Sequence, residues 1–359
     1  MICPDIQARI EAAHGRIRSD ILRTPLEFSP ALSRLTGAEV YVKWESGQRT
    51  GSFKFRGALN KVRSLTAAEK KKGVVSASTG NHGLGISLAA EMEGVGLTLV
   101  LPRNVAPAKR KRLEKGGAEI ITHGESCEKA EIWGRELAAR TGRSYISPYN
   151  DEEIIAGQGT IGREILEDLP GVEASLVPVG GGGLIAGWLK GSGRAVEVYG
   201  VEPSNSAVVA ASLAAGAIVE ITEEETIADA VAGGLEPGTI TFPLCRELLD
   251  GIILVEEPLI KRAMRLLWEY HQKMVEGAGA LALAGLMKDS GRLAGKKVAI
   301  VASGGNIAPE VFEKAVRLEG PSSGALLCSF FWPVSPGAAG NRPQGSTPWA
   351  FFRSPMPRP

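Results

Sequence analysis

The sequence predicts an α/β protein built on a largely parallel sheet with helices on its faces. Short apolar runs typical of buried strands alternate with segments of helical periodicity, and this alternation favours strands joined by crossover helices. Leu97–Leu101, a helix expected over 108–115 and a strand over 119–122 form one such unit. The runs expected as strands are Val74–Ser76, Leu97–Leu101, Glu119–Thr122, Ser175–Val179, Glu197–Val201 and Val298–Val301.

Composition restricts the class of protein. The chain has 359 residues, enough for two lobes with separate cores, and a formal net charge of +1, which indicates neither nucleic acid nor an acidic membrane surface as a partner. No stretch is long and apolar enough to span a bilayer. Residues 10–23 resemble an amphipathic helix and not a signal peptide. The cysteines (Cys3, Cys127, Cys245, Cys328) lack Cys-x-x-Cys spacing, which favours reduced thiols in a cytoplasmic protein.

Lys54 is the first candidate for chemistry, because it lies between Phe53 and Phe55. Two flanking rings would partly desolvate the ε-amino group and favour its neutral form, which can attack a carbonyl and form a Schiff base. The alternative is a solvated lysine at the start of an amphipathic helix. The assignment of Lys54 therefore depends on what the rest of the chain supplies.

A run of four glycines follows the apolar strand expected over 174–179, and a helix is expected over 184–190. Bare backbone amides at a helix N-terminus form a cradle suited to a phosphate. No Lys-Ser/Thr pair follows the glycines, so the run is not a nucleotide P-loop. A flexible linker is the alternative, but a linker would not follow a buried strand. The cradle consists of Gly180, Gly181, Gly182, Gly183 and Leu184.

Two polar turns follow other strands. Ser303 ends the strand expected over 297–301, where its hydroxyl can hydrogen-bond a neutral heterocyclic nitrogen, although an ordinary βα turn looks the same. The second turn opens a helix expected over 82–93. Its hydroxyls, amide and backbone N–H groups suit a carboxylate, although Ser78 or Thr79 could simply cap the helix. Its members are Ser78, Thr79, Gly80, Asn81 and His82.

Together these motifs resemble the fold-type II pyridoxal-phosphate enzymes, and within them the serine/threonine dehydratase (threonine ammonia-lyase) and serine racemase group. The resemblance extends from about residue 17 to residue 318. Further matching stretches are Ile155–Thr160, Val201–Asn205, Thr226–Asp229 and Glu276–Ala280.

The resemblance implies pyridoxal 5′-phosphate as the cofactor, held covalently by Lys54. It implies that Lys54 and Thr79 are catalytic. The remaining cofactor-binding residues would be Phe53, Asn81, Gly180, Gly181, Gly182, Gly183, Leu184, Glu276 and Ser303. The substrate would be held by Ser78, Thr79, Gly80, Asn81 and His82.

The resemblance also implies two lobes of the tryptophan synthase β-like type, each a mostly parallel twisted sheet flanked by helices, with the cofactor in the cleft between them. The large cofactor-binding domain would comprise residues 1–72 and 149–319, and the small mobile domain residues 73–148. We expect the Pro/Gly/Ser-rich tail of residues 320–359 to be poorly ordered. A homodimer or homotetramer is expected.

The implied activity is elimination of water from L-threonine or L-serine, which releases a 2-oxo acid and ammonia. The freed Lys54 amine would act as the base at Cα. Ser303 cannot supply a charge to the ring nitrogen, which weakens the electron sink and favours β-elimination over transamination. Alternatives are a racemase, a dehydratase of a less usual 3-hydroxy amino acid, a β-replacement synthase, or a cofactor-binding protein without activity. The last is disfavoured because Lys54, Asn81, Ser303 and the glycine cradle are all present.

Three positions depart from the racemase pattern. Thr79 stands where the racemase has a second serine, and its methyl group restricts its rotamers. Glu202 and Ser206 match the racemase's divalent-ion site, but Val208 replaces an aspartate, so no metal site is expected here. Tyr149 stands near an aromatic residue of the dehydratases, where the racemase has an asparagine. These departures favour elimination.

Overall fold

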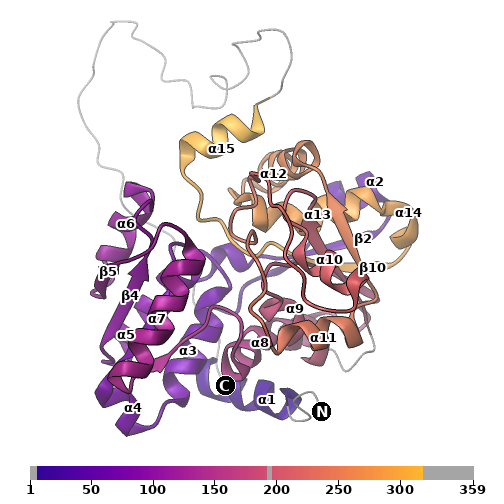
Figure 1. Ribbon diagram of the computed structural model, residues 1–359. Helices are drawn as coiled ribbons and strands as arrows, with labels where there is room; N and C mark the ends of the chain where they lie inside the picture. Colours follow the sequence, from indigo (N-terminus) through magenta and orange to yellow (C-terminus); the bar gives the residue numbers. More distant parts are fainter. Residues whose placement is uncertain (1–5, 192–195, 318–359) are drawn as a thin grey trace, which may run out of the picture. The chain divides into compact units, whose positions relative to one another are not determined.

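The computed structural model describes residues 6–191 and 196–317, and within this part of the chain two sheets are flanked by helices (Figure 1). The strands are β1 (Leu26–Phe28), β2 (Glu39–Lys43), β3 (Val74–Ala77), β4 (Leu97–Leu101), β5 (Glu119–Thr122), β6 (Ser144–Tyr145), β7 (Ala174–Pro178), β8 (Glu197–Pro203), β9 (Gly251–Val255) and β10 (Lys297–Val301). The longer helices are α1 (Ile6–Ile17), α3 (Lys54–Ser64), α5 (Asn81–Met92), α7 (Cys127–Thr141), α8 (Glu152–Asp168), α9 (Gly183–Gly191), α12 (Glu257–His271) and α13 (Gly277–Lys288). The shorter ones are α2 (Pro30–Thr36), η1 (Glu45–Gly47), α4 (Ala67–Lys72), α6 (Pro107–Glu114), α10 (Val208–Ala215), α11 (Thr241–Leu248), α14 (Ser290–Leu293) and α15 (Pro309–Val316).

The larger sheet has the strand order β1-β2-β10-β7-β8-β9, and all neighbours are parallel except β1, which is antiparallel to β2. Successive side chains of its central strand belong to different cores: Val298 and Ile300 to one, Ala299 and Val301 to the other. Because side chains alternate between the faces of a strand, both faces of this sheet are buried.

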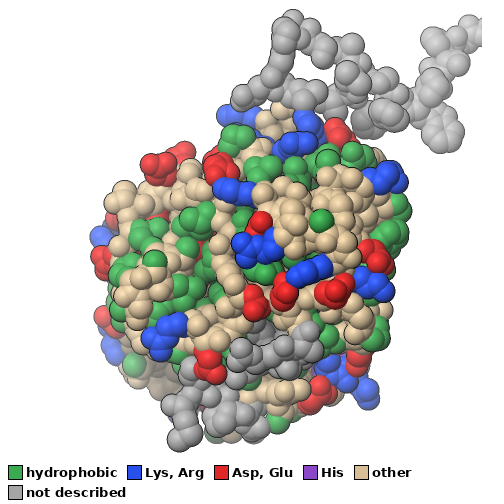
Figure 2. Space-filling view, turned by 90° about the vertical axis from the view of Figure 1, so that its right-hand side faces the viewer, with side chains coloured by type: hydrophobic (Ala, Val, Ile, Leu, Met, Phe, Trp, Pro, Cys, Tyr) green, Lys and Arg blue, Asp and Glu red, His purple; other side chains and the backbone are tan. Residues whose placement is uncertain are grey.

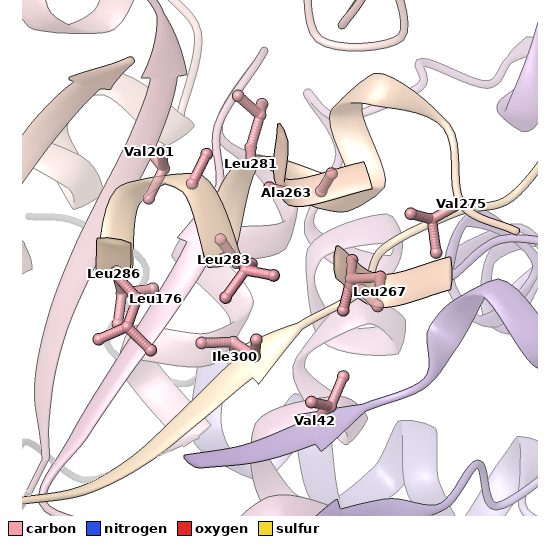
Figure 3. Packing of buried hydrophobic residues seen from close by; sticks show 14 of the residues in the cluster. Val42, Leu176, Val201, Ala263, Leu267, Val275, Leu281, Leu283, Leu286 and Ile300 are labelled. Carbon is pink, nitrogen blue, oxygen red and sulfur yellow. The ribbon is translucent and has the colours of Figure 1, made fainter. Parts of the chain in front are cut away.

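Helices α12 and α13 cover the first face. Figure 3 shows Leu283 and Leu267 of these helices beside Leu176, Ile300 and Val42 of the strands. Residues of α1, α8, α9 and α11 form the core on the other face. The sheet is therefore an inner layer, and its polar groups can reach solvent or a ligand only at the strand ends.

The smaller sheet has the order β5-β4-β3-β6 and is parallel throughout. Leu97, Leu99 and Leu101 pack with Phe55 of α3 and Ile86 of α5. The opposite face packs against Ala130 and Ala138 of α7. All its strands come from residues 74–145, whereas the larger sheet is formed by strands before and after this stretch.

All six strands expected from the sequence are present, with bounds shifted by at most two residues. The helices expected over 82–93, 108–115 and 184–190 are α5, α6 and α9. The sequence did not reveal β1, β2, β6 and β9. Three of these are edge strands, which carry a weaker apolar signal because neighbours cover them less completely.

The helix expected over 10–23 is wrong at both ends, because α1 spans Ile6–Ile17. Five residues after the end of α1, the Gln48 side chain pairs with the backbone of Leu22. The Gln48 amide accepts from the Leu22 N–H at 2.9 Å and donates to the Leu22 carbonyl at 2.8 Å. A side chain distant in sequence thus replaces the helical hydrogen bonds that periodicity alone predicts.

Among the described residues, no helix is long and apolar enough to cross a membrane. On the face in Figure 2, acidic and basic side chains are interspersed. Cys127 is exposed and Cys245 buried, and both are free thiols. Cys3, Cys328 and the tail of residues 320–359 lie outside the described residues.

A buried ionic network holds the start of α3. The guanidinium of Arg56, fully buried, donates to both oxygens of Glu45 at 2.9 and 2.8 Å and to both oxygens of Glu164 at 2.7 and 2.9 Å. Lys43 donates to the same Glu164 at 2.6 Å. Burial alone would raise the pKa of Glu164, but its hydrogen bonds to Arg56 hold that pKa below its usual value. Two cations therefore balance two anions across β2, η1, α3 and α8.

Replacing Arg56 with methionine should destabilise the fold by about 3–5 kcal/mol, because two buried carboxylates lose their partner. Arg56→Lys should be intermediate, since an ammonium cannot bond both carboxylates as a fork. The free energy of unfolding from urea titration is the measurement.

The control for this prediction is Arg103→Gln, which breaks the exposed Arg103–Glu125 pair. It should change the stability by less than about 1 kcal/mol. Equal losses in Arg56→Met and Arg103→Gln would show that the buried network contributes nothing specific.

Candidate active site

The carboxyl ends of parallel strands bring the sequence motifs to one cavity. The glycine run follows β7, Ser303 follows β10, and the polar turn before Asn81 follows β3. Ligands of open α/β sheets bind at such strand ends. The cavity is lined by Phe53, Lys54, Asn81, Tyr149, Pro178, Gly180, Gly181, Gly182, Gly183, Leu184, Ala230, Val231, Glu276, Ala278 and Ser303. Every residue that the sequence suggested for the cofactor is among them.

Lys54 is the first residue of α3, and its half-buried side chain points its amine into this cavity. The amine donates to the carbonyl of Pro148 at 2.9 Å and lies 5.2 Å from the centre of the Phe53 ring. Burial lowers the pKa of Lys54 to about 8, against the opposing charge of Glu131. The positive end of the helix dipole also disfavours an ammonium at this position.

The expected aromatic sandwich around Lys54 is wrong in one respect. Phe55 turns away from the amine into the core of the smaller sheet. Adjacent helical residues point about 100° apart, so a side chain cannot lie between both of its neighbours' rings. Only Phe53 is near the amine, and its own position is fixed because its N–H donates to the Ser303 carbonyl at 3.1 Å.

The glycine run has no room for side chains. A Cβ on Gly181 would lie 2.4 Å from the Tyr149 ring, and one on Gly180 would lie 2.8 Å from the Val231 carbonyl oxygen. Gly182 has a φ of 81°, a conformation that favours glycine. The amide N–H groups of Gly180–Gly182 donate to no other described group. Bare amides at the start of α9 thus form a cradle that suits a phosphate.

Asn81 and Glu276 belong to a chain of hydrogen bonds at the cavity wall. Asn81 donates to Glu276 at 2.7 Å and accepts from Asn306 at 2.6 Å, and Asn306 accepts from Arg112 at 2.6 Å. Burial raises the pKa of Glu276 to about 7. Near neutral pH the Glu276 carboxyl therefore exchanges between its neutral and ionised forms, and the hydrogen bonds fix the orientation of the Asn81 side chain.

Ser303 is buried in the same cavity, and its hydroxyl donates to the Ala278 carbonyl at 3.4 Å. A neutral hydroxyl at this place can accept or donate one weak hydrogen bond but cannot supply a charge.

The polar turn before α5 is not a side-chain cap. Gly80 is the N-cap residue, and no side chain caps the helix. The Ser78 hydroxyl accepts from the Gly80 N–H at 3.3 Å, and Thr79 is half-exposed without a hydrogen bond to the described residues. The capping interpretation is thus wrong, and the first amides of α5 are free to bind an anion. Ser78, Thr79 and Gly80 do not line the cavity described above, whereas Asn81 does.

His82 is buried and is not among the residues that line the cavity. Its Nε2 lies 3.1 Å from the Ser76 hydroxyl, which donates to the Ile146 carbonyl at 2.8 Å. Burial, and then the charge of Lys54, lower the pKa of His82 to about 3, so the ring is neutral. Its backbone N–H, at the start of α5, is the group that could contact a substrate.

Glu202, which matches the racemase's divalent-ion site, is bonded here to backbone N–H groups. Its carboxylate accepts from the backbone of Val209 at 3.0 Å and of Ala210 at 2.8 Å, at the start of α10. Burial raises the pKa of Glu202 to about 7. Among the described residues, no group of three His, Cys, Asp or Glu side chains could hold a metal ion.

The structure adds residues that the motifs did not assign to the cavity. Tyr149 packs on the glycine run, and Ala230 and Val231 directly follow the matching stretch Thr226–Asp229. Thr241 donates to the Gly181 carbonyl at 2.6 Å. The stretch before Ala230 was a usable signal, whereas nothing in the local sequence marks Thr241.

The chemistry of this donor set fits the expected cofactor. The bare cradle would accept its phosphate, Lys54 offers an amine that is easily made neutral, and Ser303 offers a neutral partner for a pyridine nitrogen. All three lie around one cavity.

The family of pyridoxal-phosphate dependent enzymes matches residues 17–304 of this chain. The L-threonine ammonia-lyase of Thermotoga maritima is 41% identical over 311 residues, which cover 86% of this chain and 77% of that protein.

Solved structures also resemble this chain. Processed threonine deaminase isoform 2 from Solanum lycopersicum has a TM-score of 0.82 at 33% identity, covering 87% of this chain and 93% of that one. Maize serine racemase has a TM-score of 0.81 at 32% identity, covering 86% and 96%. This chain therefore belongs to the pyridoxal-phosphate dependent enzymes.

Proposed function

We propose that this enzyme eliminates water from a hydroxy amino acid, L-threonine or L-serine, and releases a 2-oxo acid and ammonia. The observation that carries the proposal is the meeting of a lysine amine of lowered pKa, a phosphate-type glycine cradle and a neutral serine hydroxyl in one cavity. The identity to a protein named L-threonine ammonia-lyase supports the same reaction.

When bound, the cofactor supplies an aldehyde that reacts with amines and a ring that withdraws electrons from the amino acid's Cα. Lys54 would hold it and then, once displaced by the substrate's amine, remove the proton from Cα. A pKa near 8 lets Lys54 both accept and return a proton close to neutral pH. The Pro148 carbonyl, 2.9 Å away, orients the amine.

The substrate's carboxylate would bind at the start of α5, where Ser78, Thr79 and Asn81 surround uncapped backbone amides. Ser303 would offer the ring nitrogen only an uncharged hydroxyl, so the ring would withdraw electrons from Cα weakly. A weak electron sink would favour loss of the β-hydroxyl over transamination. Residues 73–148 would form a small mobile domain that carries the carboxylate site.

A second candidate is racemisation, favoured by the similarity to maize serine racemase and by the free hydroxyl of Thr79. A proton donor on the face of Cα opposite Lys54 would return the proton with inversion. The methyl group of Thr79 restricts that hydroxyl, which places racemisation behind elimination.

The purified enzyme with L-threonine, L-serine, their D-enantiomers and other 3-hydroxy amino acids tests the proposal directly. Keto acid, ammonia and the enantiomer of the remaining substrate are scored together. We expect equal amounts of keto acid and ammonia from an L-substrate. Formation of the D-enantiomer without keto acid would support the racemase instead.

Lys54→Ala should reduce keto acid formation at least about 1,000-fold, because both the covalent anchor and the Cα base are lost. It should also abolish the visible absorbance of the bound cofactor. Lys71→Ala, at an exposed lysine of α4, is the matched control and should keep both properties. Turnover and absorbance unchanged in Lys54→Ala would remove Lys54 from the mechanism.

The cofactor-free protein should capture pyridoxal 5′-phosphate at a rate that rises with pH and levels off above about 8, the pKa of Lys54. Only the neutral amine attacks an aldehyde, and the lowered pKa moves the neutral form to lower pH. Stopped-flow absorbance at a series of pH values is the measurement. A rate that keeps rising toward pH 10.5, the ordinary lysine value, would contradict the burial of this amine.

A further inference from the structure

The loop of residues 147–150, between β6 and α8, borders the cavity through Tyr149. Pro148 supplies the carbonyl that accepts from Lys54, and Tyr149 packs on the glycine run. The orientation of the Lys54 amine and the packing on the glycine run thus both depend on the conformation of one short loop. None of the motifs in the sequence explains what holds this loop in place.

Glu236 is bonded to this loop at three points. Its carboxylate accepts from the Ser147 hydroxyl at 3.2 Å and from the Asn150 side-chain amide at 3.0 Å. Its backbone N–H donates to the Tyr149 hydroxyl at 2.9 Å. Every residue of the loop that has a polar side chain is therefore bonded to Glu236.

The same carboxylate reaches the smaller sheet. Arg135 of α7 forms an ion pair with Glu236 at 2.5 Å and stacks on the Tyr145 ring at 4.3 Å. Arg135 also bonds Glu131 at 3.1 Å. Burial, and then the charge of Glu236, raise the pKa of Glu131 to about 7. Glu236 is thus one of two carboxylates that pair with Arg135, the shorter pair of the two, and only one-fifth of its side chain is exposed.

The segment that begins at Glu236 also supports the phosphate side of the cavity. Its Ile240 N–H donates to the Asn150 side-chain carbonyl at 3.1 Å, and Thr241 donates to the Gly181 carbonyl at 2.6 Å. One segment between α10 and α11 therefore fixes both the loop that orients Lys54 and the glycine cradle.

We propose that Glu236 is a positioning residue, which holds the 147–150 loop against α7 so that the Pro148 carbonyl orients the Lys54 amine and Tyr149 closes the glycine cradle. This role of Glu236 rests on the proposed function only because it takes Lys54 as the reacting amine. The loop lies between Glu236 and Lys54 in this series of hydrogen bonds. Glu236 therefore acts through Pro148 and Tyr149 and is not proposed to contact the substrate.

Glu236→Ala and Glu236→Gln separate the hydrogen-bond pattern from the charge. The glutamine can retain the whole pattern, because its carbonyl accepts from Asn150 and Arg135 while its amide donates to the Ser147 hydroxyl, which can also accept. The alanine removes every side-chain bond. Lys109→Gln is the control, since it breaks the exposed Lys109–Asp229 pair and touches no residue of the loop.

Two properties are measured for each variant: kcat and KM for the substrate, and the rate at which the cofactor-free protein captures pyridoxal 5′-phosphate. We expect Glu236→Ala to lower kcat and the capture rate at least tenfold each, with KM changed less than threefold. Glu236→Gln should have a kcat and a capture rate within threefold of those of the original enzyme. Lys109→Gln should have the same kcat and capture rate as the original enzyme. Glu236→Ala with rates like those of Lys109→Gln would overturn the proposal.

A thermal melt distinguishes positioning from general destabilisation. Glu236→Ala should retain a single cooperative transition, with its midpoint well above the temperature at which the assays are performed. If it does not fold, Asn150→Ala removes one donor to the carboxylate and the acceptor for Ile240, and should lower the capture rate about three- to tenfold. An unchanged capture rate in that variant would equally overturn the proposal.

The capture assay also keeps this proposal apart from the proposed reaction. If the original enzyme forms no keto acid from any hydroxy amino acid, the proposed function fails. The capture rates of the variants still report whether Glu236 positions Lys54, because that assay contains no substrate.

Discussion

The buried pairing of Arg56 with Glu45 and Glu164 is the interaction on which the geometry of the site depends. Arg56 lies two residues after Lys54 on the same first turn of α3, so fixing its guanidinium fixes the direction of the helix start. Glu45 follows β2 and Glu164 belongs to α8, so the network joins a strand of the larger sheet and a helix to one turn of α3. Such a network is costly to desolvate, and its value here lies in specifying one arrangement rather than in adding stability.

The parallel topology of the two sheets brings the other site segments together. The cradle after β7, the serine turn after β10 and the polar turn after β3 are separated by more than a hundred residues in sequence, yet each follows the carboxyl end of its strand. Because all of these strands are parallel to their neighbours, their carboxyl ends lie at one edge of each sheet. The Phe53 N–H bond to the Ser303 carbonyl then joins the lysine turn to the serine turn directly.

Local patterns predicted much of this, and non-local contacts account for what they missed. Buried strands and glycine turns are recognisable because apolar runs and bare backbone have few other uses. The non-helical path of the chain at Leu22, where a helix was expected, was not recognisable, since Leu22 pairs with the side chain of the distant Gln48. The role of Glu236 was equally hidden, because its partners Arg135, Ser147 and Asn150 come from other parts of the chain. The direction of Phe55 was misjudged for a different reason: a neighbour in sequence was taken as a neighbour in space, whereas consecutive residues of a helix point about 100° apart.

The electrostatics of the cavity follow one rule, which explains why a lysine can be the reacting group. Burial favours the neutral form of each titratable group at its wall: it lowers the pKa of Lys54 to about 8 and raises that of Glu276 to about 7. Burial, and then the charge of Lys54, also keep His82 neutral, with a pKa of about 3. A fixed carboxylate beside Lys54 would hold the amine as an ammonium and prevent its attack on a carbonyl. The acidic groups on this side, Glu131 and Glu236, instead balance Arg135, which leaves the Lys54 amine with an uncharged partner, the Pro148 carbonyl. Recognition of anions is therefore left to the backbone amides at the starts of α5 and α9, which can bind an anion without placing a fixed carboxylate beside Lys54.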